Sequence, residues 1–211
     1  MSIRTATVER KTAETSVKLI LNLDGNGHGV IDSGIGFFDH MLNLMTAHGL
    51  MDLTLACDGD IDVDGHHSVE DIGITLGQAF KQAIGDKKGI RRYGTFYLPM
   101  DEALAFVSLD ISGRPFLVYD GGEMAPMIGG YDTELTEEFL RAFAVNAGIT
   151  LHVRVLYGKN SHHKVEAIFK ALGHALQEQI AVDAQHNDRF LTNLAAQAVS
   201  RPSEHPDARR A

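Results

Sequence analysis

A pair of adjacent histidines followed by a glutamate occurs twice in this chain of 211 residues. The first copy is His66–Glu70, with the sequence HHSVE, and the second is His162–Glu166, with the sequence HHKVE. Imidazoles and carboxylates bind divalent transition metals, and a glutamate three or four residues after a histidine can share its helix face. Adjacent helical residues point about 100° apart, so we expect the two histidines of each pair to serve different ions.

The similarity between the two halves extends beyond these clusters. With the histidine pairs aligned, and a two-residue deletion allowed in the intervening hairpin, His40 corresponds to Glu138. Both side chains can bind a metal, so we predict that they occupy equivalent coordination positions. Glu14 likewise corresponds to Glu102, because each immediately precedes a predicted strand.

The ligand types indicate which metals such a site would bind. A set of imidazoles and carboxylates without thiolate suits manganese, iron, cobalt or zinc. The candidate ligands are His40, His66, His67, Glu70, Glu138, His162, His163 and Glu166, with Glu14 as a further candidate. Shared between two six-coordinate ions, this set leaves positions open for substrate or water, which is typical of catalytic sites. Because neighbouring histidines diverge, we expect some of them to reach an ion of a neighbouring subunit, so that the metal promotes self-association.

Basic residues supply candidates for a second part of the site. Arg92 follows the last helix of the first half, and Arg114 lies in the turn Ser112–Pro115, where a guanidinium can bind a phosphate with two hydrogen bonds. Three other cations after that helix, Lys87, Lys88 and Arg91, are interpreted as solvated residues that favour its dipole. The isolated histidines His28, His48, His174, His186 and His205 are interpreted as surface or helix-capping residues.

The hydrophobic pattern predicts the elements that must position these residues. Alternating apolar and polar residues predict strands at 16–23, 52–55, 103–111 and 151–155. Apolar residues at helical spacing predict helices at about 37–48, 69–84, 134–147 and 164–180. Each half therefore reads as strand, helix, strand or hairpin, helix, which predicts two similar α+β units. The halves are residues 1–93 and 94–182, joined by the turn-rich segment 85–94; residues 183–211 form a divergent, flexible tail with at most a short helix at 191–198.

Composition excludes several classes of function. With 19 basic and 28 acidic residues the net charge is −9, which argues against a general binder of nucleic acid or anionic membranes. No apolar run approaches the length of a membrane span, and the polar segment Met1–Lys11 does not look like a signal peptide. A single cysteine, Cys57, rules out an internal disulfide framework and favours a reducing cytoplasm.

A series of motifs, taken in order, closely resembles the imidazoleglycerol-phosphate dehydratase family. The motifs are RKTAET at 10–15, GFFDHML at 36–42, DGHHSVED at 64–71, MDEA at 100–103, SGRP at 112–115 and NSHH at 160–163. The resemblance covers roughly residues 4–182. It implies an internally duplicated α+β fold of β-α-β-α halves, with helices sandwiched between two four-stranded sheets, as in the second domain of ribosomal protein S5. It also implies two manganese ions per site and assembly of trimers into a 24-subunit particle.

The resemblance further implies a hydro-lyase of L-histidine biosynthesis that converts D-erythro-imidazoleglycerol phosphate to imidazoleacetol phosphate. Two metal ions on the ring nitrogens would stabilise an imidazolate, whose electrons expel the hydroxyl next to the ring and form a diazafulvene. The implied roles are metal ligation for His40, His66, His67, Glu70, His162, His163 and Glu166, acid–base catalysis for Glu14, and phosphate binding for Arg92 and Arg114. Glu14 would remove the proton that the intermediate acidifies.

The chain departs from the family pattern at two places. Family members often carry histidine at the position of Glu138, where the repeat alignment makes glutamate a replacement ligand. After Val182 the chain has no equivalent of the Pro-Ser-Ser/Thr-Lys-Gly segment that contributes phosphate contacts in the family. Two other classes would use the same ligands: a dinuclear metallohydrolase and a non-enzymatic metal-binding assembly protein. The paired arginines favour an enzyme over the assembly protein.

Overall fold

The computed structural model describes residues 4–180 of the chain. The tail predicted at 183–211, with its short helix at 191–198 and with His186 and His205, lies outside the described residues. The first half contains β1 (Thr5–Lys11), β2 (Thr15–Asn22), β3 (Gly29–Asp32), α1 (Gly36–Gly49), β4 (Asp52–Gly59) and α2 (His66–Ile84). The second contains β5 (Tyr93–Met100), β6 (Ala103–Asp110), β7 (Phe116–Asp120), β8 (Met127–Ile128), β9 (Tyr131–Asp132), α3 (Leu135–Ala147), β10 (Thr150–Tyr157) and α4 (Ser161–Ile180).

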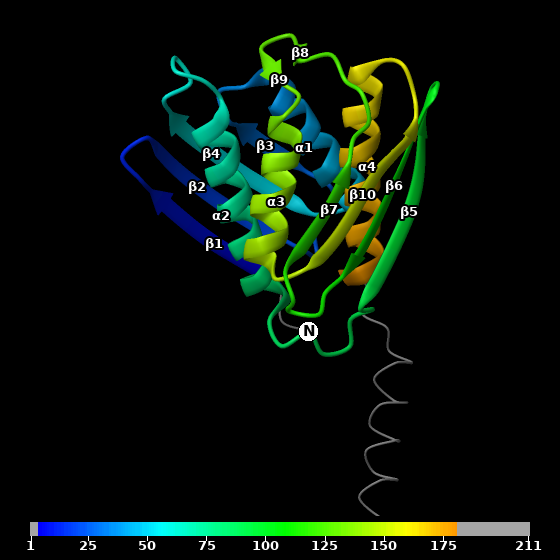
Figure 1. Ribbon diagram of the computed structural model, residues 1–211. Coiled ribbons are helices and arrows are strands. Elements are labelled where there is room, and N and C mark those ends of the chain that lie inside the picture. Colours follow the sequence, from blue (N-terminus) through cyan, green and yellow to red (C-terminus); the bar gives the residue numbers. More distant parts are fainter. Residues whose placement is uncertain (1–3, 181–211) are drawn as a thin grey trace, which may run out of the picture.

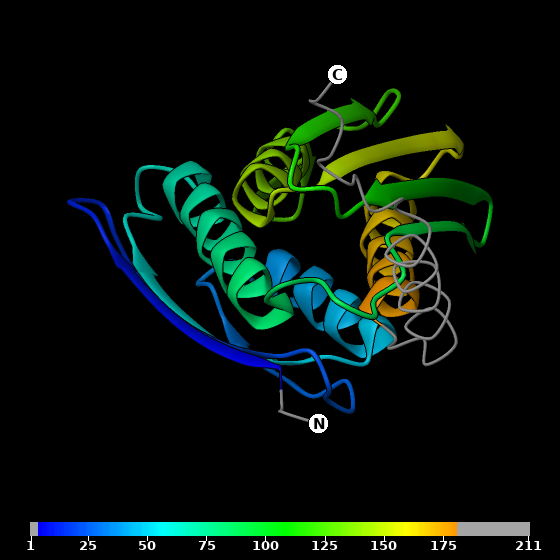
Figure 2. The ribbon, with the colours of Figure 1, turned by 90° about the horizontal axis from the view of Figure 1, so that it is seen from below.

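The two halves repeat the same topology. The first sheet has the order β1-β2-β4-β3 and the second has the equivalent order β5-β6-β10-β7, while β8 and β9 form a small inserted hairpin. Viewed along the helix layer, the four helices lie between the two four-stranded sheets (Figure 2). The predicted fold, a duplicated α+β structure with sandwiched helices, is therefore confirmed.

The prediction of strands was incomplete. The alternating patterns correctly indicated β2, β4, β6 and β10, but they missed β1, β3, β5 and β7 and the short strands β8 and β9, so each four-stranded sheet has two strands that the pattern did not indicate. β1, β3, β5 and β7 are the edge strands of the two four-stranded sheets. Only Ala6 and Val8 of β1 are buried, and no residue of β3 is fully buried, so these strands carry little of the period-two signal.

Each helix packs against a helix of the other half: α1 against α4, and α2 against α3. Two glycines at equivalent positions of the repeat permit this close approach. A Cβ atom on Gly77 would lie 2.7 Å from the carbonyl oxygen of Phe143, and one on Gly173 would lie 2.5 Å from that of Met45. The buried apolar faces of all four helices join the inner faces of both sheets in one hydrophobic core.

The four helices begin at the same end of the molecule, beside the β8–β9 hairpin (Figure 1). The sequence places candidate ligands near the starts of these helices: His40 in α1, His66 in α2, Glu138 in α3 and His162 in α4. The positive ends of the helix dipoles therefore lie among the carboxylates and favour their ionised form. Within residues 4–180, no helix is both long and apolar enough to cross a membrane.

Candidate metal centre and active site

His40, His162 and Glu166 form a group of three potential metal ligands. One ligand atom from each lies within 4.8 Å of the other two. The Nε2 atoms of His40 and His162 lie 3.7 and 3.1 Å from Oε2 of Glu166. The Glu166 side chain is only 8% exposed, whereas His40 is open to solvent. Two imidazoles that converge on a buried carboxylate suit a divalent cation with one side left open.

The charge of Glu166 is balanced by its neighbours. Burial raises the pKa of this carboxyl, but the hydrogen bonds and charges of Lys170 and His162 outweigh burial and leave the pKa below its usual value. Lys170 Nζ lies 2.5 Å from Oε1 of Glu166. Glu166 is therefore ionised near neutral pH, as a metal ligand must be.

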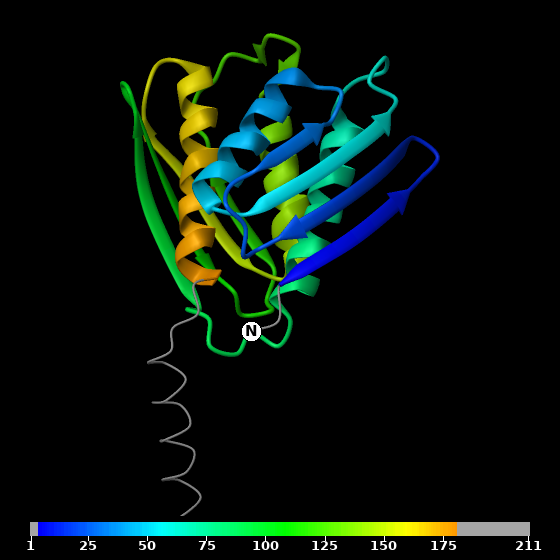
Figure 3. The same ribbon diagram turned by 180° about the vertical axis from the view of Figure 1, so that it is seen from behind.

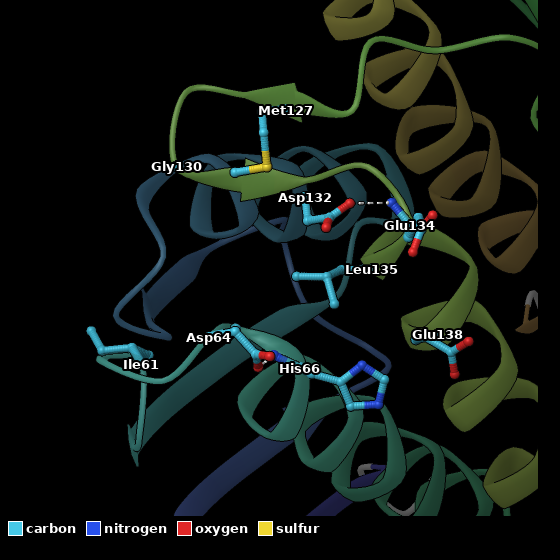
Figure 4. Close-up of a pocket in the computed structure, with 10 residues that line it drawn as sticks. Ile61, Asp64, His66, Met127, Gly130, Asp132, Glu134, Leu135 and Glu138 are labelled. Carbon is cyan, nitrogen blue, oxygen red and sulfur yellow. Dashed lines mark hydrogen bonds between the residues drawn. The ribbon is translucent and has the colours of Figure 1, made fainter.

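The counterparts of these ligands lie at the facing ends of α2 and α3. His66 and Glu138 line one cavity of about 510 Å³, together with Asp64, Asp132 and Glu134 (Figure 4). Glu70, the counterpart of Glu166, follows one turn after His66 on α2 and is half-buried. The structure thus groups three of the predicted ligands, His40, His162 and Glu166, and places His66 and Glu138 beside one cavity, and both arrangements combine residues from both halves.

The two rings of each histidine pair are steeply inclined to each other, and the second histidine of each pair contacts a carboxylate. The ring planes of His66 and His67 are inclined by 89°, and those of His162 and His163 by 79°. His67 Nδ1 lies 2.9 Å from Asp60. His163 Nδ1 lies 2.7 Å from Oε2 of Glu102.

These contacts raise the pKa of both histidines, chiefly through the hydrogen bonds to Asp60 and Glu102. A carboxylate that accepts the Nδ1–H of a histidine fixes the tautomer in which Nε2 is available to a metal. Asp60 and Glu102 thus orient His67 and His163, neither of which belongs to the three-residue group, and Nε2 of His163 lies 3.7 Å from Oδ2 of Asp101.

Glu14 and Glu102 occupy equivalent turns but have different surroundings. Glu102 Oε1 accepts the backbone N–H groups of Asn160 at 2.7 Å and Lys159 at 3.0 Å. These bonds and the one to His163 lower the pKa of Glu102 to about 2. The exposed Glu14 lies close enough to His67 that its charge, after that of Asp60, helps to raise the pKa of this histidine. Of the two exposed carboxylates, Glu102 is therefore the one held by hydrogen bonds from a neighbouring loop and helix.

Both candidate phosphate-binding arginines contact Asp110 at the end of β6. Arg92 binds it through two hydrogen bonds of 2.6 and 3.0 Å, and Arg114 Nη2 lies 3.7 Å away. Glu102 lies just before the other end of β6. The eight residues of this strand span roughly 26 Å, which separates Glu102 from the arginines. Within one chain, the structure brings the arginines together but places them far from His163.

The isolated histidines His48 and His174 contact each other. His48 Nδ1 and His174 Nε2 are 3.1 Å apart, and Phe96 stacks on the His174 ring. Both histidines are half-buried between α1 and α4, so their interpretation as surface residues was wrong. His48 does not cap its helix, since the backbone N–H of Leu50 binds the carbonyl of Ala47 there.

Comparison with known proteins agrees with this geometry. The family model for imidazoleglycerol-phosphate dehydratase matches residues 33–176. An imidazoleglycerol-phosphate dehydratase of Clostridium botulinum (strain Langeland) is 62% identical over 182 residues, which cover 86% of this chain and 93% of the relative. The chain belongs to the imidazoleglycerol-phosphate dehydratase family. The family resemblance predicted from the motifs is confirmed, and with it the expected class of enzyme, a hydro-lyase.

Solved structures of the imidazoleglycerol-phosphate dehydratase family share the fold. The enzyme from Staphylococcus aureus superposes with a TM-score of 0.76 at 42% identity, covering 85% of this chain and 99% of that chain. The enzyme from Pyrococcus furiosus, in complex with (S)-C348, gives a TM-score of 0.72 at 34% identity, covering 83% of this chain and 93% of that one.

The structure shows contacts of the candidate ligands that sequence reasoning missed. Asp60 contacts His67, Glu102 contacts His163 and Lys170 contacts Glu166. The spacing of Lys170, four residues after Glu166, was a usable signal because such residues share a helix face. Asp60 carried no comparable signal, because its contact with His67 depends on the path of the loop after β4.

Proposed function

We propose that this chain is a metal-dependent hydro-lyase that removes water from imidazoleglycerol phosphate and forms imidazoleacetol phosphate in histidine biosynthesis. The observation that carries the proposal is the convergence of His40, His162 and Glu166 from two halves of a chain in this family. Imidazoles and a buried, ionised carboxylate suit a divalent transition metal and have no evident structural task at an exposed helix end.

Two ions per site would follow from the repeat. His40, His162 and Glu166 would hold one ion, and Glu138, His66 and Glu70 would hold the other. When bound, the two ions would stabilise the deprotonated form of the substrate imidazole by binding its two ring nitrogens. The additional carboxylate at Glu138 favours a harder ion, and we infer Mn²⁺ as the preferred metal.

The remaining residues would bind the substrate and move its proton. Glu14, exposed and near His67, would take the proton from the side-chain carbon next to the one that loses its hydroxyl. Arg92 and Arg114 would bind the phosphate, for which two guanidinium groups around one point are suited. Asp110 accepts two hydrogen bonds from Arg92 and lies 3.7 Å from Arg114, so it lies beside both guanidinium groups.

A complete site would need more than one chain. The arginines lie roughly 26 Å from the Glu102 end of β6, too far to reach a small substrate at the metal ligands of the same chain. His67 and His163, held through Nδ1, would offer Nε2 to ions of neighbouring subunits. We therefore infer metal-dependent assembly, with the trimer-based 24-mer as the expected particle, in the cytoplasm.

A dehydratase assay tests the proposal. Protein stripped of metal by a chelator is supplied with imidazoleglycerol phosphate, and imidazoleacetol phosphate is measured before and after Mn²⁺ is added. We expect turnover to depend on the metal. Release of inorganic phosphate would instead indicate a metallohydrolase, and stoichiometric metal binding without turnover would indicate an assembly protein.

A further inference from the structure

The turn between β1 and β2, which carries Glu14 at the edge of the first sheet (Figure 3), is tied to helix α2 by one buried carboxylate, Asp71. Asp71 Oδ1 accepts a hydrogen bond from Arg10 Nε at 2.7 Å. Its Oδ2 accepts bonds from the hydroxyls of Thr15 and, at 3.4 Å, Thr12. A buried carboxylate is costly unless it is paired and hydrogen-bonded, and Asp71 is both.

Thr12 connects this carboxylate to the backbone of Glu14. Its hydroxyl oxygen accepts the N–H of Glu14 at 3.3 Å and that of Thr15 at 2.9 Å. The backbone N–H of Thr12 in turn donates to the carbonyl of Thr15 at 2.9 Å. The hydrogen bonds within the turn therefore run through Thr12, whose hydroxyl also donates to Asp71 of α2.

Asp71 directly follows Glu70, one of the proposed metal ligands. The hydrogen bonds of Asp71 therefore connect the helix that carries Glu70 to the turn that carries Glu14. Motion of the turn relative to the ligand would require loss of hydrogen bonds to a buried charge.

In the second half, the corresponding turn is held by different residues. The residue equivalent to Asp71 is Ala167, which is fully buried. There the turn is held by Glu102 itself, through the N–H groups of Lys159 and Asn160 and through His163. A small apolar residue therefore suffices for packing at this position. In the first half the buried Asp71 makes the hydrogen bonds that hold the turn, so the Glu14 side chain is not needed for that task.

We propose that Asp71 and Thr12 are positioning residues that set the place of Glu14 relative to the metal ligand Glu70. The proposal rests on the proposed function, in which Glu14 exchanges the proton. Misplacement of a reacting group by about 1 Å can cost up to about 100-fold in rate. Loss of the Thr12 hydroxyl should therefore lower kcat and leave substrate and metal binding largely intact.

The test is a double-mutant cycle with Thr12→Val and Glu14→Gln in the metal-loaded protein. We expect Thr12→Val to lower kcat at least about 10-fold, with KM and metal content changed by less than about twofold. In the Glu14→Gln background, Thr12→Val should have no further effect, because the group that it positions has already lost its function. Equal fold-losses in both backgrounds, or an unchanged kcat in the single variant, would overturn the proposal.

Three further variants complete the design. Thr12→Ser keeps the hydroxyl and should have the kcat of the unmodified protein. If Glu14→Gln is too slow to measure, this comparison of serine with valine tests the positioning role in its place. A low kcat in Thr12→Ser would contradict that role. Asp71→Asn replaces Thr12→Val in the cycle if the valine variant does not fold. Asp24→Asn is the control, because it breaks the Arg4–Asp24 pair at the other end of the same two strands and should leave kcat unchanged. Absence of turnover in the unmodified protein would refute the proposed function, whereas normal turnover with additive losses would refute only this inference.

Discussion

His40 on α1 and Glu166 on α4 belong to different halves of the repeat, yet Nε2 of the first lies 3.7 Å from Oε2 of the second. Neither half contains the three-residue group by itself. The pairing of α1 with α4 brings these residues together, and the pairing of α2 with α3 does the same for His66 and Glu138. The duplicated candidate ligands therefore come together only when the halves are packed against each other.

Replacement of Glu166 by glutamine should remove one of two bound ions per chain. The substitution keeps the shape of the side chain but removes the charge on which His40 and His162 converge. Elemental analysis after exhaustive dialysis measures the metal content. Glu137→Gln, on the exposed pair with Arg141, is the control and should retain both ions. Two ions retained by Glu166→Gln would contradict the assignment.

Glu138→His should retain both ions but change their selectivity. An imidazole in place of a carboxylate makes this set of ligands softer, which favours zinc or nickel over manganese. Competition between Mn²⁺ and Zn²⁺, followed by elemental analysis, measures the shift. Glu138→Ala should lose one ion; if alanine retains it with unchanged affinity, Glu138 is not a ligand.

Alanine at Gly77 or Gly173 should destabilise the fold by about 1–3 kcal/mol, because a Cβ atom would collide with the backbone of the facing helix. Urea unfolding at equilibrium measures the free energy of unfolding. Gly36→Ala is the matched control, since a Cβ atom there meets no heavy atom within 4 Å. Equal stability of the Gly77 and Gly36 variants would show that the helix contact tolerates the methyl group.

Asp52 should contribute stability that is lost in acid. The backbone N–H groups of Asn26 and His28 bind its carboxylate and hold its pKa below the usual 3.8. A lowered folded-state pKa stabilises the fold above the unfolded-state pKa, and this contribution disappears as the pH falls through the folded value. The difference in unfolding free energy between the unmodified protein and Asp52→Asn should therefore shrink from about pH 7 to about pH 3. A difference that does not vary with pH would contradict this assignment.

If each site combines residues from several chains, an assembly that mixes two inactive variants should regain activity. Arg114→Ala removes a proposed phosphate contact and Glu14→Gln removes the proposed base. After dissociation by chelator and reassembly together with Mn²⁺, some sites would receive an intact arginine from one chain and an intact glutamate from another. We expect the mixture to turn over faster than either variant reassembled alone. No gain after verified mixing would place both residues in a site of one chain.

The sequence alone determined the candidate ligands, the repeat that relates them and the four helices that carry them. These features are local: a helical period and a ligand spacing depend on residues within a few turns of each other. The divergence of His66 and His67 followed from the same geometry. The edge strands β1, β3, β5 and β7 escaped detection because few of their residues are buried.

Only the tertiary structure decided which ligands meet. Contacts of His40 with Glu166, of His163 with Glu102 and of Thr12 with Asp71 join residues far apart in the chain, and no spacing encodes them. The repeat alignment treats Glu14 and Glu102 as equals and both are exposed, but folding engages Glu102 in hydrogen bonds with Lys159, Asn160 and His163. That difference arises from the neighbours that each turn acquires on folding, which long-range packing sets.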